Sequence, residues 1–185
     1  VSCDLSAGTL YALVGKSGSG KTTLLSLLAG LDTPLGGDLM VNGQSLREID
    51  VDIYRRKQAS VIYQSYNLFP LMTVCENVMY PLKLLRHSDA DAKKEAQIAL
   101  EKVGLGESYW KRLPAMLSGG EQQRVAIART LAVHAQIILA DEPTGNLDTE
   151  NSTQIIQLLS RLAHEENCCV VVVTHDLEVA KAADV

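Results

Sequence analysis

The sequence predicts an α/β fold in which a mostly parallel β-sheet alternates with helices and is interrupted by a helical insert. Three observations support this prediction. The chain opens with an apolar strand, a glycine-rich loop and a helix. Strand, helix and strand follow one another again near its end, and the middle is rich in alanine and lysine. Strands that alternate with helices form parallel sheets with right-handed crossovers, because the connection between parallel strands has room for a helix.

The first third of the chain predicts three strands and one helix. Residues 9–14 are a β-prone apolar run, and from Lys21 the pattern becomes helical because leucines recur at the spacing of one helix face. These leucines are Leu24, Leu27, Leu28 and Leu31. Two further short strands are predicted at 38–42 and 59–63, with a turn at Asn42-Gly43.

The middle of the chain predicts helices, and its end predicts strands. Residues 88–103 form a capped amphipathic helix, and a second helix begins at Ser118. The continuous apolar runs 136–140 and 169–174 suit strands of a sheet that is covered on both faces. A helix at 151–163 is predicted between these two strands.

Composition and charge limit the classes of function. The 185 residues are 46% hydrophobic and 21% charged, which is typical of one globular domain. The longest strongly apolar run is far shorter than the about 20 residues that a membrane-spanning helix needs. The net charge of -5 has the wrong sign for binding nucleic acid by bulk charge, so we expect no nucleic-acid partner. The four cysteines lack the spacing of a metal site or a disulfide scaffold, which favours a reducing cytoplasm.

The first motif with chemistry is the segment 15–22, GKSGSGKT, which fits the phosphate-binding loop pattern GxxxxGK[ST]. It stands between a predicted strand and a predicted helix, and this context disfavours the alternative of a plain flexible turn. Its glycines let backbone N–H groups and the helix N-terminus converge on phosphate oxygens. We expect Lys21 to reach the β- and γ-phosphates and the Thr22 hydroxyl to ligate Mg²⁺.

The second motif is the segment 137–142, IILADE, an apolar strand that ends in two carboxylates. Ligands of open α/β sheets bind at such strand ends. Asp141 is expected to hold Mg²⁺ through water, and Glu142 to polarise a water that attacks the γ-phosphate. Alone, the pair is equally consistent with a solvated strand end, but beside a phosphate-binding loop the catalytic interpretation is favoured.

The third motif is the segment 117–124, LSGGEQQR, which we call the signature segment. Ser118 and Glu121 have the spacing of a capping box, so a helix begins here. A plain cap does not need Gly119 and Gly120, because each glycine costs the helix about 1 kcal/mol relative to alanine. We therefore expect a close approach to the backbone at this point. A helix N-terminus also binds phosphate, and we expect this second site to serve a nucleotide on another subunit.

Together these motifs resemble the nucleotide-binding domain of an ATP-binding cassette transporter. The resemblance rests on GKSGSGKT, LSGGEQQR, ILADEPT followed by GNLD, and the triplet Thr174-His175-Asp176, and it covers essentially the whole chain. It implies a RecA-like P-loop core with an antiparallel β part and an inserted helical subdomain. Within the single domain 1–185 we assign 1–64 and 134–185 to the core and 65–133 to the subdomain. We also expect the domain to be truncated at both ends and to lack the upstream aromatic residue that stacks on adenine in the family.

The resemblance also implies roles for individual residues. Gln64 matches a glutamine that reaches Mg²⁺ and the attacking water, His175 a histidine that contacts the γ-phosphate, and Asp148 an aspartate that communicates across a dimer interface. The expected catalytic residues are thus Glu142, His175 and Gln64, and the expected Mg²⁺ ligands are Thr22, Gln64 and Asp141. The residues expected to bind ATP are Gly15, Lys16, Ser17, Gly18, Ser19, Gly20, Lys21, Thr22, Thr23, Ser118, Gly119, Gly120, Glu121 and Asp148.

The function that the resemblance implies is hydrolysis of MgATP between two head-to-tail copies, which powers a separate membrane permease. The motifs are most similar to exporter types that serve lipoprotein release, macrolide efflux and antimicrobial-peptide resistance. The segment 64–74 is expected to receive a permease helix, unless its aromatics belong to the core of the helical insert. This would hold the protein in the cytoplasm against the inner face of the cell membrane.

Two other classes are less consistent with the sequence. A non-transport cassette ATPase that acts on DNA or ribosomes is the alternative, but DNA-repair members place a long coiled coil between the P-loop and the signature. There is no room for one here. A P-loop GTPase or small-molecule kinase is disfavoured because the chain has no NKxD-type guanine motif and such enzymes have no use for the signature segment.

Overall fold

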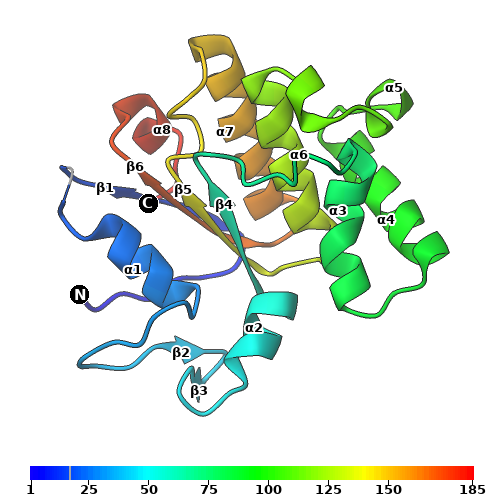
Figure 1. The fold of residues 1–185 in the computed structure, drawn as a ribbon. Helices are drawn as coiled ribbons and strands as arrows, with labels where there is room; N and C mark the ends of the chain where they lie inside the picture. Colours follow the sequence, from blue (N-terminus) through cyan, green and yellow to red (C-terminus); the bar gives the residue numbers. More distant parts are fainter. Residues whose placement is uncertain (17) are drawn as a thin grey trace.

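The computed structural model describes residues 1–16 and 18–185, and its centre is a four-stranded sheet (Figure 1). The strands lie in the order β1-β6-β5-β4. Their bounds are Thr9–Val14 for β1, Ala59–Tyr63 for β4, Ile137–Asp141 for β5 and Cys169–Thr174 for β6. Each neighbouring pair is parallel, which confirms the predicted α/β fold.

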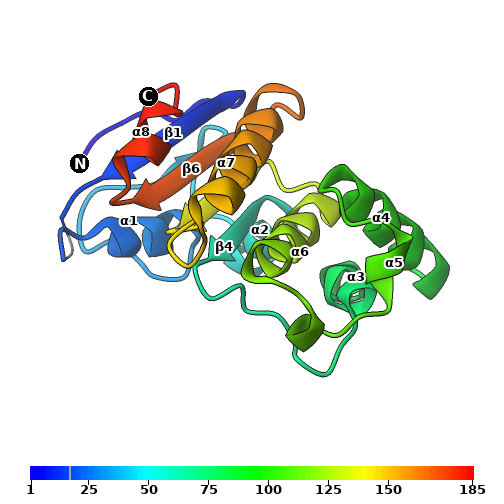
Figure 2. The ribbon, with the colours of Figure 1, turned by 90° about the horizontal axis from the view of Figure 1, so that it is seen from above.

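Strand β6 shows why the sheet needs helices on both faces. All six of its residues are buried, and successive side chains of a strand point to opposite faces. Val170 and Val172 join the apolar cluster that contains α7 (Thr149–His164), whereas Val171 and Val173 join the cluster that contains α1 (Lys21–Leu28). Figure 2 shows β6 between these two helices.

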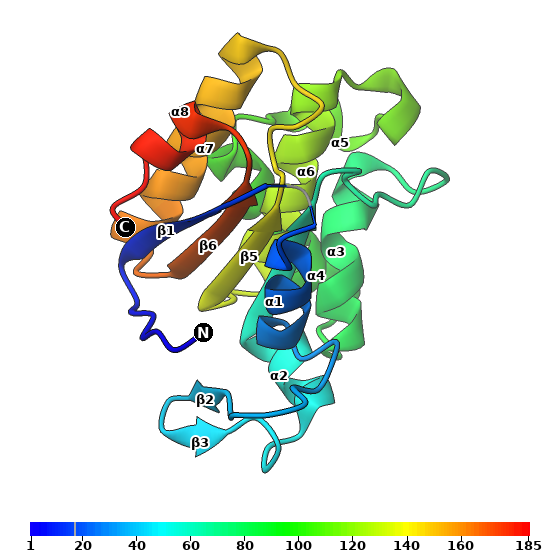
Figure 3. The same cartoon turned by 90° about the vertical axis from the view of Figure 1, so that its left-hand side faces the viewer.

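A small antiparallel sheet and a short helix follow α1. Strands β2 (Met40–Val41) and β3 (Gln44–Ser45) pair across Asn42 and Gly43, both of which have positive φ. This confirms the predicted turn and antiparallel part, although the strand predicted at 38–42 is shorter and its partner was not predicted. Helix α2 (Val51–Lys57), also unpredicted, begins after the Asp50 cap. Figure 3 shows this region below α1.

The middle of the chain forms a group of helices beside the sheet, seen on the right of Figure 2. Helices α3 (Val74–Leu84), α4 (Asp89–Lys102) and α6 (Gly119–Ala132) pack on one another, and α6 also packs on β4 and α7. The elements between α4 and α6 are α5 (Glu107–Trp110) and the 3₁₀ helix η1 (Pro114–Met116). The predicted helices at 88–103 and from Ser118 are confirmed.

The last helix, α8 (Leu177–Lys181), follows β6. Among residues 1–16 and 18–185, no helix combines the length and the apolar character that crossing a bilayer requires.

The predicted apolar face of α1 is wrong in part. Leu25 is the buried residue of this helix, whereas Leu24, Leu27 and Leu28 are only partly buried and Leu31 is exposed. Leu31 is exposed because α1 ends at Leu28 and the chain turns at Gly30, which has φ 65°. A Cβ atom at Gly30 would lie 2.7 Å from Val51 Cγ1, so α2 packs closely against this turn.

Tyr54 joins α2 to α1. Its ring is buried, and its hydroxyl donates a hydrogen bond of 2.7 Å to the Leu28 carbonyl at the end of α1. Burial raises the pKa of Tyr54 from 10.0 to about 12, with a smaller contribution from Cys169. The folded protein therefore holds this phenol in its neutral, donating form.

We predict that Tyr54→Phe lowers the free energy of unfolding by about 1 kcal/mol at pH 7, because the Leu28 carbonyl loses a buried partner. The difference should shrink above pH 10. The folded pKa of about 12 lies above the ordinary value of 10.0, so the wild type loses this stabilisation as pH rises through that interval, and phenylalanine does not titrate. Urea unfolding at pH 7 and pH 11 measures both effects.

Tyr80→Phe, which removes the hydroxyl of a half-buried ring of α3, is the matched control. A stability difference between wild type and Tyr54→Phe that is the same at both pH values would contradict a buried neutral phenol.

Candidate functional site

The parallel register brings the ends of all four strands to one edge of the sheet. Tyr63 pairs with Asp141, Asp141 pairs with Val173, and Val14 pairs with Thr174. The residues that follow the strands therefore surround one space, a cavity of about 620 Å³. Its lining is Gly18, Gly20, Lys21, Thr22, Thr23, Gln64, Asp141, Glu142, Val173 and His175.

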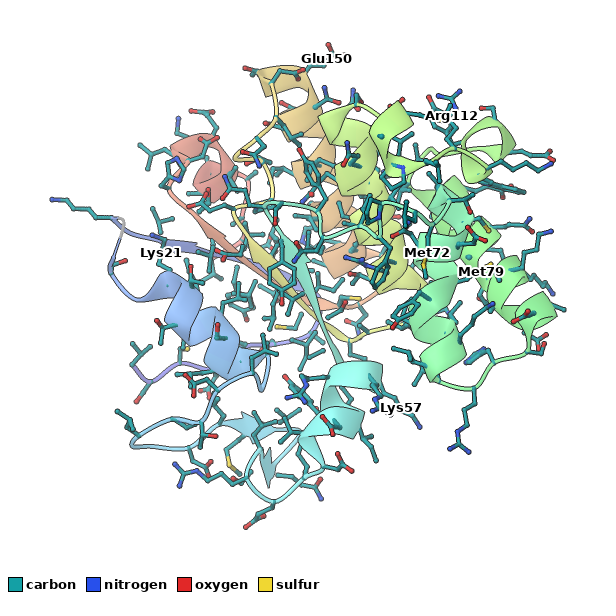
Figure 4. All side chains as sticks on the ribbon, in the orientation of Figure 1. Lys21, Lys57, Met72, Met79, Arg112 and Glu150 are labelled. Atoms are coloured by element: carbon teal, nitrogen blue, oxygen red, sulfur yellow. The ribbon has the colours of Figure 1, made fainter. Side chains whose placement is uncertain are left out.

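The glycine-rich loop and the start of α1 form one wall of this cavity. Gly18 and Gly20 have φ values of 78° and 88°, which only glycine adopts at low cost. Lys21 folds back so that Nζ donates to the carbonyls of Gly15 at 2.7 Å and Lys16 at 3.1 Å, and Figure 4 marks it at the start of α1. In the described part of the chain no side chain caps the first turn of α1, so its N–H groups suit an anion.

The predicted loop residues are placed as follows. Gly18, Gly20, Lys21, Thr22 and Thr23 line the cavity. Gly15, Lys16 and Ser19 are in the same loop but outside the lining, and a Cβ atom at Gly15 would lie 2.8 Å from Ser19 Oγ. Ser17 is outside the described residues.

Asp141 and Thr22 meet at the floor of the cavity. Thr22 Oγ1 donates to Asp141 Oδ1 at 3.3 Å. The pKa of Asp141 is raised, first by burial and also by the charge of Glu142, while the bond from Thr22 and the charge of Lys21 act in the opposite direction. The charged form of the Asp141 carboxylate is thus not fully compensated by the groups around it.

The oxygen atoms at this point suit Mg²⁺. Thr22, Asp141 and Gln64 offer a hydroxyl, a carboxylate and an amide oxygen, which are hard ligands. Residues 1–16 and 18–185 contain no group of three or more His, Cys, Asp or Glu side chains that could hold a metal on their own. The three oxygen ligands from Thr22, Asp141 and Gln64 fit Mg²⁺, which keeps several waters and binds substrate phosphates.

Glu142 is held by β6 on two sides. Its backbone N–H donates to the Val173 carbonyl at 2.9 Å, and its φ is 47°, a left-handed conformation that is costly outside glycine. Thr174 Oγ1 donates to Oε2 at 3.3 Å, and His175 Nδ1 lies 2.8 Å from Oε1. The Glu142 side chain is 19% exposed and that of His175 is 72% exposed. The carboxylate is therefore fixed beside the cavity, and the histidine is open to a ligand.

The signature segment lies outside the cavity lining. Ser118 caps α6 by accepting from Glu121 N at 3.3 Å, and Glu121 Oε2 accepts from Ser118 N at 2.7 Å, which confirms the capping box. None of the predicted residues Ser118, Gly119, Gly120 and Glu121 lines the cavity, so the chain does not bring the two predicted phosphate sites together. This is consistent with a signature that serves another subunit.

The close approach expected at the two glycines occurs within the chain itself. A Cβ atom at Gly119 would lie 2.9 Å from the Tyr66 hydroxyl, and one at Gly120 would lie 2.2 Å from Asn151 Oδ1. Asn151 in turn is held by Asp148, because its Nδ2 donates to both carboxylate oxygens at 3.0 and 2.9 Å. Hydrogen bonds from Asn151 lower the pKa of Asp148, which also lies outside the cavity lining.

Two residues that the sequence analysis missed, Arg129 and Asn146, support Gln64 and the segment after it. Tyr66 and Asn67 have positive φ values of 62° and 48°. Arg129 of α6 donates to their carbonyls at 3.1 and 2.7 Å, and burial lowers the pKa of this guanidinium. The second missed residue, Asn146, bonds to both the backbone carbonyl and the side chain of Gln64. No local pattern in the sequence points to these contacts, because each joins residues distant in the chain.

The chain resembles known proteins along almost its whole length. The family model described as ABC transporter matches residues 1–145. The uncharacterized ABC transporter ATP-binding protein YclH of Bacillus subtilis is 41% identical over 96% of this chain and 79% of its own length. The lipoprotein-releasing system ATP-binding protein LolD of Hydrogenovibrio crunogenus is 45% identical over 98% of this chain and 80% of its own.

Two solved structures have the same fold. The dimeric structure of MJ0796, a bacterial ABC transporter cassette, matches with a TM-score of 0.87 and 39% identity, covering 98% of this chain and 81% of that one. A dimeric post-hydrolysis state of the same cassette, bound to ADP and Pi, matches with a TM-score of 0.87 and 38% identity over the same shares.

We predict that Gly120→Ala destabilises the protein, because the new methyl group displaces the Asn151 amide from Asp148. In the Asn151→Ala background the amide group is gone and the Cβ atom of residue 151 remains, 3.1 Å from the new methyl group, so the same Gly120→Ala change should cost clearly less stability. The four proteins of this double-mutant cycle are compared by urea unfolding. An equal loss of stability for Gly120→Ala in both backgrounds would show that the Asn151 amide does not determine the glycine.

Proposed function

The chain belongs to the ABC transporter family, and we propose that its cavity holds the triphosphate of ATP with Mg²⁺ for hydrolysis. Its function is that of the ATP-binding, ATP-hydrolysing subunit of such a transporter. The observation that supports the proposed site residues is the row of strand ends, which aligns the P-loop, two carboxylates and a histidine around one cavity.

The geometry suggests a role for each group around the triphosphate. The free N–H groups of α1 and the Lys21 ammonium bind the β- and γ-phosphates. Glu142 orients a water and accepts its proton as the water oxygen bonds to the γ-phosphorus and the bond to the bridging oxygen breaks, leaving ADP and Pi. His175 is exposed beside Glu142, and when the nucleotide is bound the ring N–H that faces Glu142 here turns to donate to a γ-phosphate oxygen.

Mg²⁺ would be held by Thr22 and Gln64 directly and by Asp141 through water. When bound, it neutralises charge on the β- and γ-phosphate oxygens. The raised pKa of Asp141 supports this assignment, because a cation there would compensate a carboxylate that burial and Glu142 destabilise.

We propose that a second copy of the chain completes the site. Ser118 and Gly119 lie at a capped helix start outside the lining of their own chain's cavity, and a related cassette has been solved as a dimer in two structures. In a head-to-tail pair, Ser118 to Glu121 of one copy face the γ-phosphate on the P-loop of the other. Asp148, which starts α7, lies at the interface.

A membrane permease is the proposed partner of the segment 64–74. In this segment Leu71 is 91% exposed, and Phe69 is 38% exposed and packs on Tyr80. Outside it, Met116, which directly precedes the signature segment, is 64% exposed. An exposed apolar surface of this kind suits a protein partner. The relative named for lipoprotein release supports an exporter type, in which the protein lies in the cytoplasm on the inner face of the membrane. The segment 65–133 would then act as the helical subdomain between permease and core, 1–64 and 134–185.

We predict that Glu142→Gln lowers kcat by about 10²- to 10⁴-fold, because the amide cannot accept the proton of the attacking water. Affinity for MgATP should stay near that of the wild type, and ATP should trap a dimer that size-exclusion chromatography detects. Glu101→Gln, an exposed glutamate of α4, is the control. Undiminished turnover in Glu142→Gln would exclude its role as the base.

We predict that two inactive variants restore activity when mixed. Lys21→Ala removes the P-loop charge, whereas Ser118→Asp keeps a good helix cap but repels the γ-phosphate. In a head-to-tail heterodimer one of the two sites is intact, so random pairing should give about a quarter of the wild-type sites. Steady-state ATPase assays of each variant and of the mixture measure this. No recovery on mixing would contradict the head-to-tail site.

A further inference from the structure

Gln64 and Asn146 are joined by two hydrogen bonds across the edge of the sheet. Asn146 Nδ2 donates to the backbone carbonyl of Gln64 at 3.1 Å, and Gln64 Nε2 donates to Asn146 Oδ1 at 3.3 Å. Gln64 follows β4, and Asn146 lies in the loop between β5 and α7. The neighbouring Gly145 makes room for this pair, because a Cβ atom there would lie 2.6 Å from Gln64 Nε2.

These two bonds fix which end of the Gln64 amide faces the cavity. The backbone carbonyl of Gln64 can only accept a hydrogen bond, so the Asn146 amide is oriented with Nδ2 toward this carbonyl. Asn146 Oδ1 is then left as an acceptor on the other side. Because Asn146 Oδ1 can only accept a hydrogen bond, the Gln64 side chain turns its donor, Nε2, toward it. Within residues 1–16 and 18–185, Gln64 Oε1 accepts no hydrogen bond, so it remains available at the cavity, which Gln64 lines.

We propose that Asn146 is a positioning residue that orients the Gln64 amide oxygen for Mg²⁺. This inference rests on the proposed role of Gln64 as a metal ligand. An amide nitrogen has no free lone pair for a cation, so a flipped Gln64 would present N–H groups to the metal. The flipped state would also place Gln64 Oε1 against Asn146 Oδ1, two acceptors without a proton between them. Asn146 therefore disfavours the orientation that cannot bind the cation.

The test compares ATP affinity in Mg²⁺ with ATP affinity in EDTA by isothermal titration calorimetry, using the full chain. Asn146→Leu keeps the size of the side chain and removes both hydrogen bonds. We expect it to lower affinity in Mg²⁺ by about ten-fold, as is usual when the support of a metal ligand is lost, and to leave affinity in EDTA unchanged. Urea unfolding of the same variant separates this effect from a loss of stability.

Orientation is separated from packing by repeating the change in the Gln64→Glu background. Both oxygens of a carboxylate bind metal, so a glutamate at position 64 needs no orienting partner. Asn146→Leu should therefore cost affinity in Mg²⁺ only when residue 64 is glutamine. An equal loss in both backgrounds would overturn the orienting role.

Gln64→Ala distinguishes the two levels of the argument. If Gln64→Ala lowers affinity in Mg²⁺ and Asn146→Leu does not, the role of Asn146 is wrong and that of Gln64 stands. If Gln64→Ala leaves the Mg²⁺ dependence unchanged, Gln64 is not a metal ligand, and both proposals fail.

Discussion

The structure depends on the parallel pairing of four strands in a shared register. Because Tyr63, Asp141 and Val173 lie side by side, and Val14 lies beside Thr174, four loops distant in the chain leave the sheet at one edge. A slip of one residue in any strand would turn its side chains to the opposite face and would move the residue after it out of the cavity. The burial of β6 on both faces prevents such a slip, since its valines fill two apolar clusters at once. The packing of the core thus determines the geometry of the site.

The loop from Glu142 to Asp148 connects the parts that the sheet alone does not bring together. At its start, Glu142 is held by the backbone and side chains of β6, in a conformation that is costly for a residue other than glycine. In its middle, Asn146 bonds to Gln64, and at its end Asp148 holds Asn151 against Gly120 of the signature. A movement of this loop would therefore displace Glu142, the segment after β4 and the start of α6. This coupling is local and rests on hydrogen bonds between short polar side chains.

Sequence alone predicts the parts of the fold that local rules determine. The continuous valines of β6 and the Ser88 cap with Gly104 at the end of α4 give bounds that match the structure closely. Helix α3 escapes detection because Pro81 and the buried Asn77 interrupt its apolar pattern, and Asn77 is satisfied by the carbonyls of Phe69 and Met72 outside the helix. The residues around the P-loop and the strand-end carboxylates follow from motifs. The amide pair of Gln64 and Asn146 does not, because the two residues are 82 positions apart and meet only through the register of β4 and β5.

In the proposed head-to-tail pair, each chain supplies one half of a nucleotide site and a second copy completes it. A crystal structure with Mg²⁺ and a non-hydrolysable ATP analogue tests this most directly. We expect the phosphates to lie on Gly18 to Thr22, the cation to lie next to Thr22 and Asp141, and Ser118 and Gly119 of a second copy to contact the γ-phosphate. Two results would contradict the proposed site. One is a chain saturated with nucleotide in this cavity while every signature segment faces solvent. The other is a nucleotide bound elsewhere on the chain.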